Sequence, residues 1–318
     1  MESRSLGSLF PVSSLTLGGG GLGQIWGPTT REEAVATVRE AVESGITLLD
    51  MAAMYGADGE AERVVGEAFD GKLPNGVHIT TKCRVGTPNS TEVYAHLLAS
   101  LTASLARLRM KRVDLFFLHN MLADDAPEGA TTRTPLSLFF AAVVPAFERL
   151  KADGLIGAWG ITGIGEPAAV MRVFESPTPP AAVQCIANLL DSPGGLKRFE
   201  GPARPREIIA AATEAGVGVM GIRAVQAGAL TSGIDRELAA DHPEMVDFAR
   251  AAPFRALAAE LGRSPAFLAH QYAVGMQGID TVVLGVKNRE ELQECIAAAS
   301  QPMSVEVRAR IDAAVTGR

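Results

Sequence analysis

The chain has 318 residues, with 29 Lys or Arg against 36 Asp or Glu, so its formal net charge is −7. This acidic balance argues against nucleic acid as a partner, because binding to a phosphate backbone relies on an excess of cations. Hydrophobic residues make up 47% and charged residues 20% of the chain. These fractions are typical of a globular protein and exclude intrinsic disorder.

No segment is predicted to cross a membrane or direct secretion. The longest apolar run, residues 136–147, is interrupted by Ser137 and Pro145, and it is far shorter than the roughly 20 residues that span a bilayer. The first ten residues carry both charge signs and no long apolar stretch, so they do not resemble a secretory signal. Three widely spaced cysteines favour reduced thiols over disulfides. We therefore expect a cytoplasmic protein that does not bind membranes.

Short apolar runs rich in Val, Ile and Leu alternate with longer segments of helical periodicity along the chain. The runs are Ser14–Leu17, Thr47–Asp50, His78–Lys82, Leu115–His119, Ile156–Ile161, Ala182–Ile186, Gly218–Ile222 and Thr281–Gly285. Strands without polar alternation favour a parallel sheet covered by helices. Eight such units predict an α/β fold, a (β/α)8 TIM barrel. Because no linker interrupts the pattern, we expect residues 1–318 to form a single domain.

The helices between these strands have recognisable ends. The first begins with a capping box at Thr30 to Glu33 and ends at Gly45. Further helices are predicted at Glu60–Phe69, Thr91–Arg109, Leu136–Asp153, Glu166–Glu175, Arg206–Ala215 and Arg289–Ala299. Additional helices near Val246–Leu261, Pro265–Ala273 and Val305–Ala314 exceed the basic repeat and are expected to decorate the barrel.

Gly18, Gly20 and Gly23 follow the first strand and satisfy the G-x-G-x-x-G pattern of dinucleotide-binding turns. That turn works only when its last glycine opens a helix whose N-terminus holds a pyrophosphate. Here residues 24–30 separate Gly23 from the first predicted helix. We therefore reject a Rossmann fold and expect a flexible loop that approaches its neighbours closely at the barrel mouth.

Ionisable residues end three successive predicted strands: Asp50, Lys82 and His119. Tyr55 follows Asp50 in the next loop. Because the C-terminal ends of barrel strands meet at one mouth, all four side chains can converge on one cavity. An ammonium at the end of an apolar strand is costly unless it is paired, so Asp50 is the natural partner of Lys82.

These four residues suit the reduction of a carbonyl group. The ordinary pKa of a tyrosine is about 10, so the side chain donates its proton at neutral pH only when a cation stabilises the phenolate. Lys82 supplies that cation, and His119 can donate a hydrogen bond to the carbonyl oxygen. None of the four supplies a hydride, so a nicotinamide cofactor is required.

The sequence resembles the aldo-keto reductase family, whose members are barrel oxidoreductases that use a nicotinamide cofactor. The similarity covers almost the whole chain. It is carried by Asp50, by Tyr55-Gly56 and Gly59 with Glu62, by Thr80-Thr81-Lys82, by Ser104–Leu108, by Val113–Leu115 with Leu118-His119, and by Trp159-Gly160. The resemblance implies that Asp50, Tyr55, Lys82 and His119 form a catalytic tetrad.

The resemblance also implies a set of cofactor contacts. Thr162 and Gln184 match residues that hold the carboxamide, with Gly163 where the family has Asn. Ile222 replaces the usual aromatic cover of the nicotinamide, and Arg223 is placed to reach the pyrophosphate. The remaining implied contacts, including the segment similar to the adenosine-phosphate segment, are Asp50, Gly285, Lys287, Asn288, Glu291 and Glu294.

Two of these residues oppose each other in the choice of cofactor. Lys287 suits a 2′-phosphate, whereas Glu291 stands where Arg or Gln is usual in the family. A carboxylate repels a phosphate but accepts a ribose hydroxyl. We therefore expect both cofactors to be used, with NADP(H) favoured over NAD(H) by no more than about tenfold. The histidines have no metal-ligand spacing, so no metal is predicted.

Trp26, Met54, Asn120 and Met121 adjoin the tetrad or follow strands, and they either line the substrate pocket or pack within loops. The expected partner is a small aldehyde, ketone, sugar or alcohol. Two other functions stay open: a non-catalytic, nicotinamide-binding regulatory barrel, and a lyase that uses Lys82 as a Schiff-base nucleophile. The sequence indicates neither the oligomeric state nor the direction of the reaction.

Overall fold

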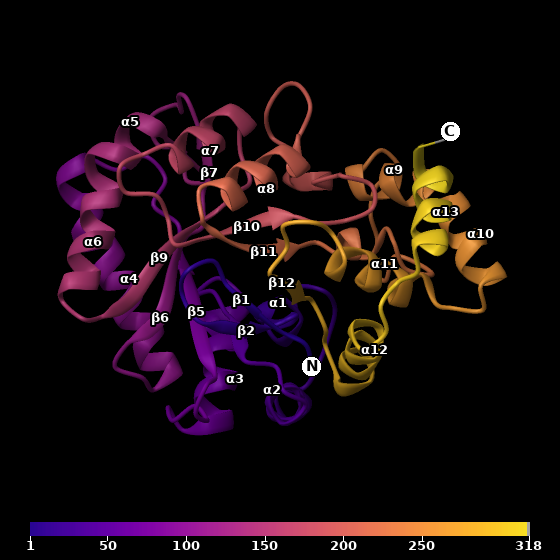
Figure 1. Ribbon diagram of the computed structural model, residues 1–318. Helices are drawn as coiled ribbons and strands as arrows, with labels where there is room; N and C mark the ends of the chain where they lie inside the picture. The colour runs from indigo at the N-terminus through magenta and orange to yellow at the C-terminus, as the bar shows by residue number, and fades with distance from the viewer. Residues whose placement is uncertain (317–318) are drawn as a thin grey trace.

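A closed barrel of eight parallel strands forms the centre of the molecule, and the computed structural model describes residues 1–316 (Figure 1). In chain order its strands are β3 (Leu15–Gly18), β4 (Leu48–Asp50), β5 (His78–Cys83), β6 (Val113–Leu118), β9 (Ile156–Thr162), β10 (Ala182–Ile186), β11 (Gly218–Ile222) and β12 (Thr281–Leu284). Each strand pairs with the next in this order, and β12 pairs with β3 to close the ring. All eight predicted strands are present and differ from the prediction only at their ends, which confirms the (β/α)8 barrel.

Helices surround the barrel (Figure 1). They are α2 (Arg31–Glu43), α3 (Glu60–Phe69), α4 (Val93–Leu108), α5 (Leu136–Leu138), α6 (Val144–Ala152), α7 (Pro167–Phe174), α8 (Pro205–Glu214), α9 (Pro243–Arg250), α10 (Ala252–Glu260), α11 (Pro265–Val274), α12 (Arg289–Ala299) and α13 (Val305–Thr316). The Thr30 cap is confirmed, because its side chain accepts the Glu33 N–H at the start of α2. The other half of the capping box is absent, since the Glu33 carboxylate accepts from Arg289 instead of from the Thr30 N–H. None of the helices within residues 1–316 is long and apolar enough to span a bilayer.

Two of the predicted helices contain a proline that alters them: the first stays helical from Leu136 to Ala152 but includes a π-helical segment, and the second is divided in two. The predicted helix at Leu136–Asp153 consists of α5, a π-helical segment at Phe139–Val143 and α6, with Pro145 in the first turn of α6. The segment near Val246–Leu261 consists of α9 and α10, and Pro253 lies in the first turn of α10. Because proline lacks an N–H and its ring clashes with a preceding carbonyl, it fits a first turn but interrupts a longer helix.

The glycine-rich loop after β3 is more ordered than the sequence predicted. It contains a one-turn helix, α1 (Gly19–Leu22), which Gly23 terminates. The predicted close approach is confirmed: a Cβ on Gly21 would lie 2.0 Å from the Val286 carbonyl oxygen. Because Gly23 ends a helix instead of opening one, and α2 begins only at Arg31, the loop does not have the geometry of a Rossmann turn.

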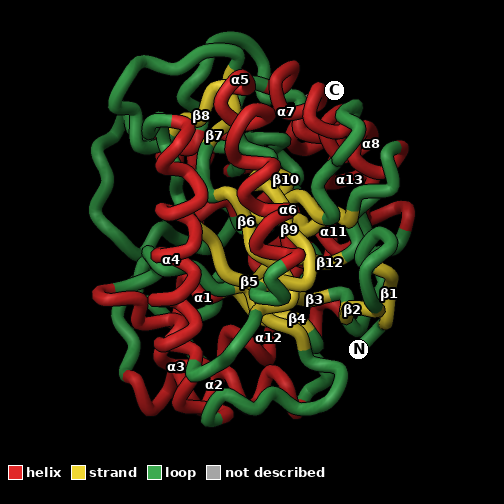
Figure 2. Tube along the Cα trace, turned by 90° about the vertical axis from the view of Figure 1, so that its left-hand side faces the viewer, coloured by secondary structure: helices red, strands yellow, loops and turns green. Residues whose placement is uncertain are grey.

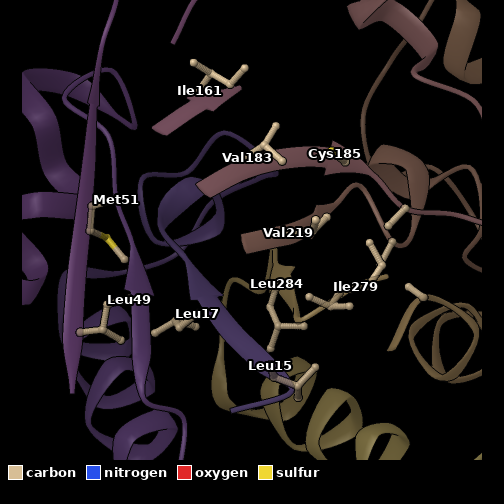
Figure 3. Packing of buried hydrophobic residues seen from close by; sticks show 14 of the residues in the cluster. Leu15, Leu17, Leu49, Met51, Ile161, Val183, Cys185, Val219, Ile279 and Leu284 are labelled. Carbon is tan, nitrogen blue, oxygen red and sulfur yellow. The ribbon is translucent and has the colours of Figure 1, made fainter. Parts of the chain in front are cut away.

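Side chains of the barrel strands point alternately inward and outward, which produces two hydrophobic clusters. The larger cluster lies between the barrel and its helices, and Figure 3 shows outward-facing members such as Leu17 and Leu49. The smaller cluster includes inward-facing residues of the strands, among them Phe117 and Met220. The C-terminal half of the barrel interior is polar instead, and this polarity marks the site described below.

Two short ribbons lie outside the barrel. A hairpin of β1 (Ser3–Ser5) and β2 (Pro11–Ser13) lies at the N-terminal ends of the barrel strands, where Leu6 contacts Gly218 at the start of β11. The second ribbon pairs β7 (Met121–Ala123) with β8 (Arg133–Pro135) in parallel. Figure 2 shows β7 and β8 beside α5 and α7, away from β1 and β2.

Candidate active site

Asp50 and Lys82 form a buried ion pair at the C-terminal ends of β4 and β5. The Lys82 Nζ lies 2.8 Å from Asp50 Oδ2 and also donates to the Met51 carbonyl oxygen at 2.8 Å. Burial by itself lowers the pKa of Lys82, but Asp50 and then Tyr55 raise it by more, so the pKa lies above its ordinary value. The predicted pairing is therefore present, and it keeps an ammonium in a barrel interior that would otherwise be costly for it.

Tyr55 reaches the same point from the loop after β4. The Lys82 Nζ lies 4.7 Å from the centroid of the Tyr55 ring. Burial raises the pKa of the Tyr55 hydroxyl, whereas Lys82 opposes this by lowering it. The net pKa is above the ordinary value, so the cation limits the increase that burial causes without reversing it. The Tyr55 hydroxyl is therefore neutral near pH 7 and has a cation beside its ring.

A buried network below Tyr55 fixes the position of its loop. Glu62 of α3 is fully buried and accepts from Thr81 Oγ1 and Arg107 Nε, each at 2.5 Å. Gly59, which has a φ of 70°, lies against Arg107: a Cβ there would be 2.4 Å from Arg107 Nε. The network ties the loop that carries Tyr55 to the outward face of β5, whose inward face carries Lys82.

His119 completes the group of four predicted residues. Its ring contacts the Tyr55 ring edge-on, with centroids 5.7 Å apart and an interplanar angle of 83°. Its backbone N–H donates to the Cys83 carbonyl oxygen at 2.7 Å, which extends the pairing of β5 and β6. Burial, followed by Lys82 and Arg84, lowers the pKa of His119 well below its ordinary value. The imidazole is therefore neutral near pH 7 and has one N–H to donate.

Gln184 and Thr162 lie on the strands next to the tetrad. Gln184 Nε2 donates to Asp50 Oδ1 at 2.8 Å, and Thr80 Oγ1 donates to the same oxygen at 2.6 Å. Thr162 Oγ1 contacts the Leu118 and Asn120 carbonyl oxygens at 3.1 and 3.2 Å. Gln184 thus orients Asp50 through its amide nitrogen, a contact that the sequence did not indicate.

The four residues predicted for a substrate pocket lie in different environments. Met54 is exposed, whereas Met121 is buried in β7. Asn120 is buried too, and its Oδ1 accepts the Val85 N–H at 2.6 Å while its Nδ2 donates to the Thr131 carbonyl. The Trp26 indole lies against Gly20 and Gly285. Asn120 therefore orders the loops around the mouth, and Trp26 lies beside the segment after β12.

Lys287 lies between two carboxylates in the segment between β12 and α12. Its Nζ lies 2.6 Å from Asp235 Oδ2 and 3.3 Å from Glu291 Oε1. Burial alone would lower the pKa of Lys287, but Asp235 and Glu291 raise it by more. Glu291 also accepts the Lys287 backbone N–H, and Asn288 caps α12 by accepting the Glu291 N–H at 2.9 Å.

Other residues predicted to bind a cofactor also have partners within the protein. Arg223 is in the left-handed region with a φ of 61°, and its guanidinium donates to Gln226 at 2.9 Å and to Glu244 at 2.5 Å. Ile222 lies at the end of β11, directly before this buried pair. Glu294 accepts a hydrogen bond from Ser264.

Sequence reasoning missed three charged residues in this region. Arg84 follows Lys82 by two positions and therefore has the same inward orientation, a signal that the strand pattern contained. Asp235 and Glu244 reach Lys287 and Arg223 from distant loop and helix positions, and no local pattern indicates such contacts. Within residues 1–316, no group of three or more His, Cys, Asp or Glu side chains is arranged to hold a metal ion.

Comparisons with known proteins agree with this geometry. The model of the Aldo/keto reductase family matches residues 14–316. L-galactose dehydrogenase of Arabidopsis thaliana is 27% identical over 307 residues, covering 95% of this chain and 89% of that protein. Methylglyoxal reductase YeaE of Escherichia coli is 32% identical over 158 residues, which cover 50% of this chain and 47% of that protein.

Solved structures share the fold over the whole chain. The holo form of aldo-keto reductase AKR11C1 from Bacillus halodurans has a TM-score of 0.74 at 24% identity, covering 99% of this chain and 96% of that one. Glycerol dehydrogenase AKR11B4 from Gluconobacter oxydans has a TM-score of 0.73 at 23% identity, covering 99% and 95%. The fold and site define an oxidoreductase barrel, and the chain belongs to the aldo/keto reductase family.

Proposed function

We propose that the protein interconverts a carbonyl group and an alcohol with NAD(P)(H), and that Tyr55 is the general acid and base. The observation that carries this proposal is the buried ion pair of Lys82 and Asp50 beneath the Tyr55 ring, with Lys82 Nζ 2.8 Å from Asp50 Oδ2. A fixed cation next to a half-buried phenol favours transfer of the phenolic proton to an oxygen on which negative charge develops.

Each member of the tetrad has a separate role in this proposal. Tyr55 donates the proton to the carbonyl oxygen or takes it from the alcohol. Lys82 stabilises the phenolate, and Asp50 keeps Lys82 charged and oriented, with Thr80 and Gln184 fixing Asp50 in turn. His119, neutral because burial lowers its pKa, donates its N–H to the same substrate oxygen and so orients the carbonyl.

The residues present fit a nicotinamide cofactor. Among residues 1–316 no group donates to the side-chain oxygen of Gln184, Oε1, whereas its side-chain nitrogen, Nε2, donates to Asp50. This oxygen suits a carboxamide N–H, and the Thr162 hydroxyl lies on the adjacent strand. Lys287 and the Asn288-capped start of α12 suit a phosphate. Ile222, Arg223 and Gly285 lie at or just after the ends of β11 and β12, and Glu294 lies within α12. When bound, the cofactor supplies or accepts the hydride.

The choice of cofactor depends on Lys287 in this proposal. Asp235 lies 2.6 Å from its Nζ, so two carboxylates and not only Glu291 compete with a 2′-phosphate for the ammonium. An exposed ion pair contributes about 1 kcal/mol or less. We therefore expect NADP(H) to be favoured over NAD(H) by no more than about tenfold.

Specific observations argue against the two alternatives. A Schiff-base lyase needs a neutral lysine as its nucleophile, whereas Lys82 is paired with Asp50 and its pKa is raised. A non-catalytic regulatory barrel has no need for a proton donor next to a buried cation. The relatives named above include two dehydrogenases and a reductase, which supports an enzyme acting on a small aldehyde, ketone, sugar or alcohol.

Replacement of Tyr55 by phenylalanine tests this function. We expect Tyr55→Phe to lower kcat by several orders of magnitude, because only the proton donor is removed, and to change the dissociation constants for NADPH and NADH little. Fluorescence titration with each cofactor and steady-state assays with a panel of aldehydes measure both effects. Tyr94→Phe is the matched control, because Tyr94 is bonded to Asp153 far from the tetrad. Full activity of Tyr55→Phe would refute the proposal.

A further inference from the structure

Arg84 is a cation at the mouth of the barrel, next to the tetrad. It directly follows β5, two positions after Lys82, so the alternation of the strand directs its side chain to the same inner side. The register of β5 and β6 pairs Cys83 with Leu118, which makes Arg84 and His119 the next opposed pair. The Arg84 guanidinium is thus placed above the ammonium of Lys82 and beside the imidazole of His119.

The backbone around Arg84 is held in place from both sides. The Arg84 carbonyl oxygen lies 2.7 Å from His96 Nε2, and the N–H of the following residue, Val85, donates to Asn120 Oδ1 at 2.6 Å. Asn120 itself directly follows His119. These two bonds hold the peptide group between Arg84 and Val85 in place, so the backbone from which the exposed Arg84 side chain extends is fixed.

A second arginine faces this position from the loop after β10. Arg198 lines a small recess at the mouth together with Met121, Arg133 and Phe199. The Arg133 guanidinium donates to the Arg198 carbonyl oxygen, which fixes this loop to the β7–β8 ribbon. Partial burial, and next the charge of Arg198, lowers the pKa of Arg84. The positive charge of Arg198 therefore acts on Arg84.

Neither cation is neutralised by the protein. Within residues 1–316, the Arg84 and Arg198 guanidinium groups form no hydrogen bond and no ion pair, although the chain has an acidic net charge of −7. One carboxylate, that of Glu166, lines the recess, but it accepts the Asp124 N–H at 3.0 Å. Arg84 is therefore a cation without an anionic partner among these residues, and an anionic group of a ligand would supply that partner.

We propose that Arg84, with Arg198 beside it, binds an anionic group of the substrate, so that the protein acts on carbonyl compounds or alcohols that carry a carboxylate or a phosphate. This inference rests on the proposed function, because it places the anion next to the carbonyl that Tyr55 and His119 address. Guanidinium groups suit both anions, because their paired N–H donors match two oxygens of either group. The relatives named above do not suggest this class, since galactose, methylglyoxal and glycerol are neutral.

Matched pairs of neutral and anionic aldehydes test the proposal. We expect kcat/KM to be at least about tenfold higher for 4-carboxybenzaldehyde than for methyl 4-formylbenzoate, or for glyceraldehyde 3-phosphate than for glyceraldehyde. The pair with the larger ratio identifies the anion. In Arg84→Gln the preference should fall at least about fivefold through a higher KM, and Arg84→Lys should retain part of it. Arg112→Gln, at the opposite end of the barrel before β6, removes the same charge and should keep the preference.

A binding measurement separates this inference from the proposed function. Calorimetry with benzoate and benzamide, in the presence of NADP+, should show that Arg84→Gln weakens benzoate about tenfold more than benzamide. The inference would be overturned if the protein reduced neutral aldehydes with no preference for anionic ones, and if Arg84→Gln lost equal affinity for benzoate and benzamide. That result would leave the proposed function intact. Selective benzoate binding without reduction of any aldehyde would support the anion site and refute the proposed function.

Discussion

The two ends of the candidate site are built in different ways. At the tetrad, Asp50 and Lys82 are part of β4 and β5, and their ion pair is buried and braced by Thr80 and Gln184. At the segment after β12, Lys287 bridges Asp235 and Glu291 in pairs that are partly exposed, one with a residue 52 positions away in the chain and one within a single helical turn. The first arrangement is rigid and low in dielectric, whereas the second is adjustable and screened by solvent.

The difference indicates where substitutions have large effects. A buried pair leaves an uncompensated charge when one partner is removed, which typically costs about 3–5 kcal/mol. An exposed pair contributes about 1 kcal/mol or less, because water and salt screen it. We therefore expect the tetrad to tolerate almost no change, and we expect the region around Lys287 to tune affinity in small steps.

The largest expected effect comes from Lys82→Met. The variant leaves Asp50 buried without its cation and removes the charge that stabilises the Tyr55 phenolate, so kcat should fall by several orders of magnitude and the free energy of unfolding by about 3 kcal/mol or more. Urea denaturation and steady-state kinetics measure the two effects. Lys151→Met, on the exposed face of α6, is the matched control and should change neither quantity much. If Lys82→Met retained its activity, the buried pair of the tetrad would be no more sensitive to substitution than the partly exposed pairs of Lys287.

Glu244→Ala tests whether the second region also contains a buried element. Glu244 pairs with Arg223 at 2.5 Å, with side chains only 5% and 10% exposed, so its removal should cost about 3 kcal/mol of unfolding free energy. Glu260→Ala removes a carboxylate from an exposed pair with Arg310 and should cost about 1 kcal/mol or less. Similar midpoints of urea denaturation for the two variants would show that burial does not distinguish these pairs.

Stability should also fall as the solution becomes more acidic. Burial lowers the pKa of His119 and of His270, so the folded protein keeps both rings neutral while the unfolded chain takes up protons below about pH 6.5. Their stabilisation is complete above that pH and is lost as the pH falls towards the folded-state pKa values, by up to about 1.4 kcal/mol per pH unit for each ring. In His270→Gln, denaturation between pH 7 and pH 5 should show a shallower decline; an unchanged slope would contradict this.

The smallest expected effect concerns the cofactor. Glu291→Gln removes one carboxylate next to Lys287 and should shift the ratio of dissociation constants towards NADPH by a few-fold, up to about tenfold, and Asp235→Asn should act in the same direction. Fluorescence titration with both cofactors measures the ratios. A wild-type preference of about a hundredfold or more for either cofactor, or no shift in both variants, would show that these residues do not govern the choice.

The features that the sequence predicted correctly are those that depend on local periodicity. The eight strands and the convergence of Asp50, Lys82, Tyr55 and His119 result from apolar runs and their terminal residues. The π-helical segment before Pro145, the break between α9 and α10 before Pro253, and the one-turn helix α1 were missed because small steric effects decide them. The contacts of Lys287 with Asp235 and of Arg223 with Glu244 were missed for another reason: a loop and a helix from distant positions in the chain supply them.

The N-terminal hairpin of β1 and β2 closes the barrel at the N-terminal ends of its strands. Leu6 and Val12 are buried against Leu48, Leu115 and Phe117, so side chains fill the interior at the level of the strand starts. Within residues 1–316, these side chains leave water no passage along the barrel axis to the Lys82 ammonium, so the tetrad is kept dry on that side. We therefore expect ligands to reach the tetrad from the opposite end of the barrel, where Tyr55, His119 and Arg84 are at least partly exposed.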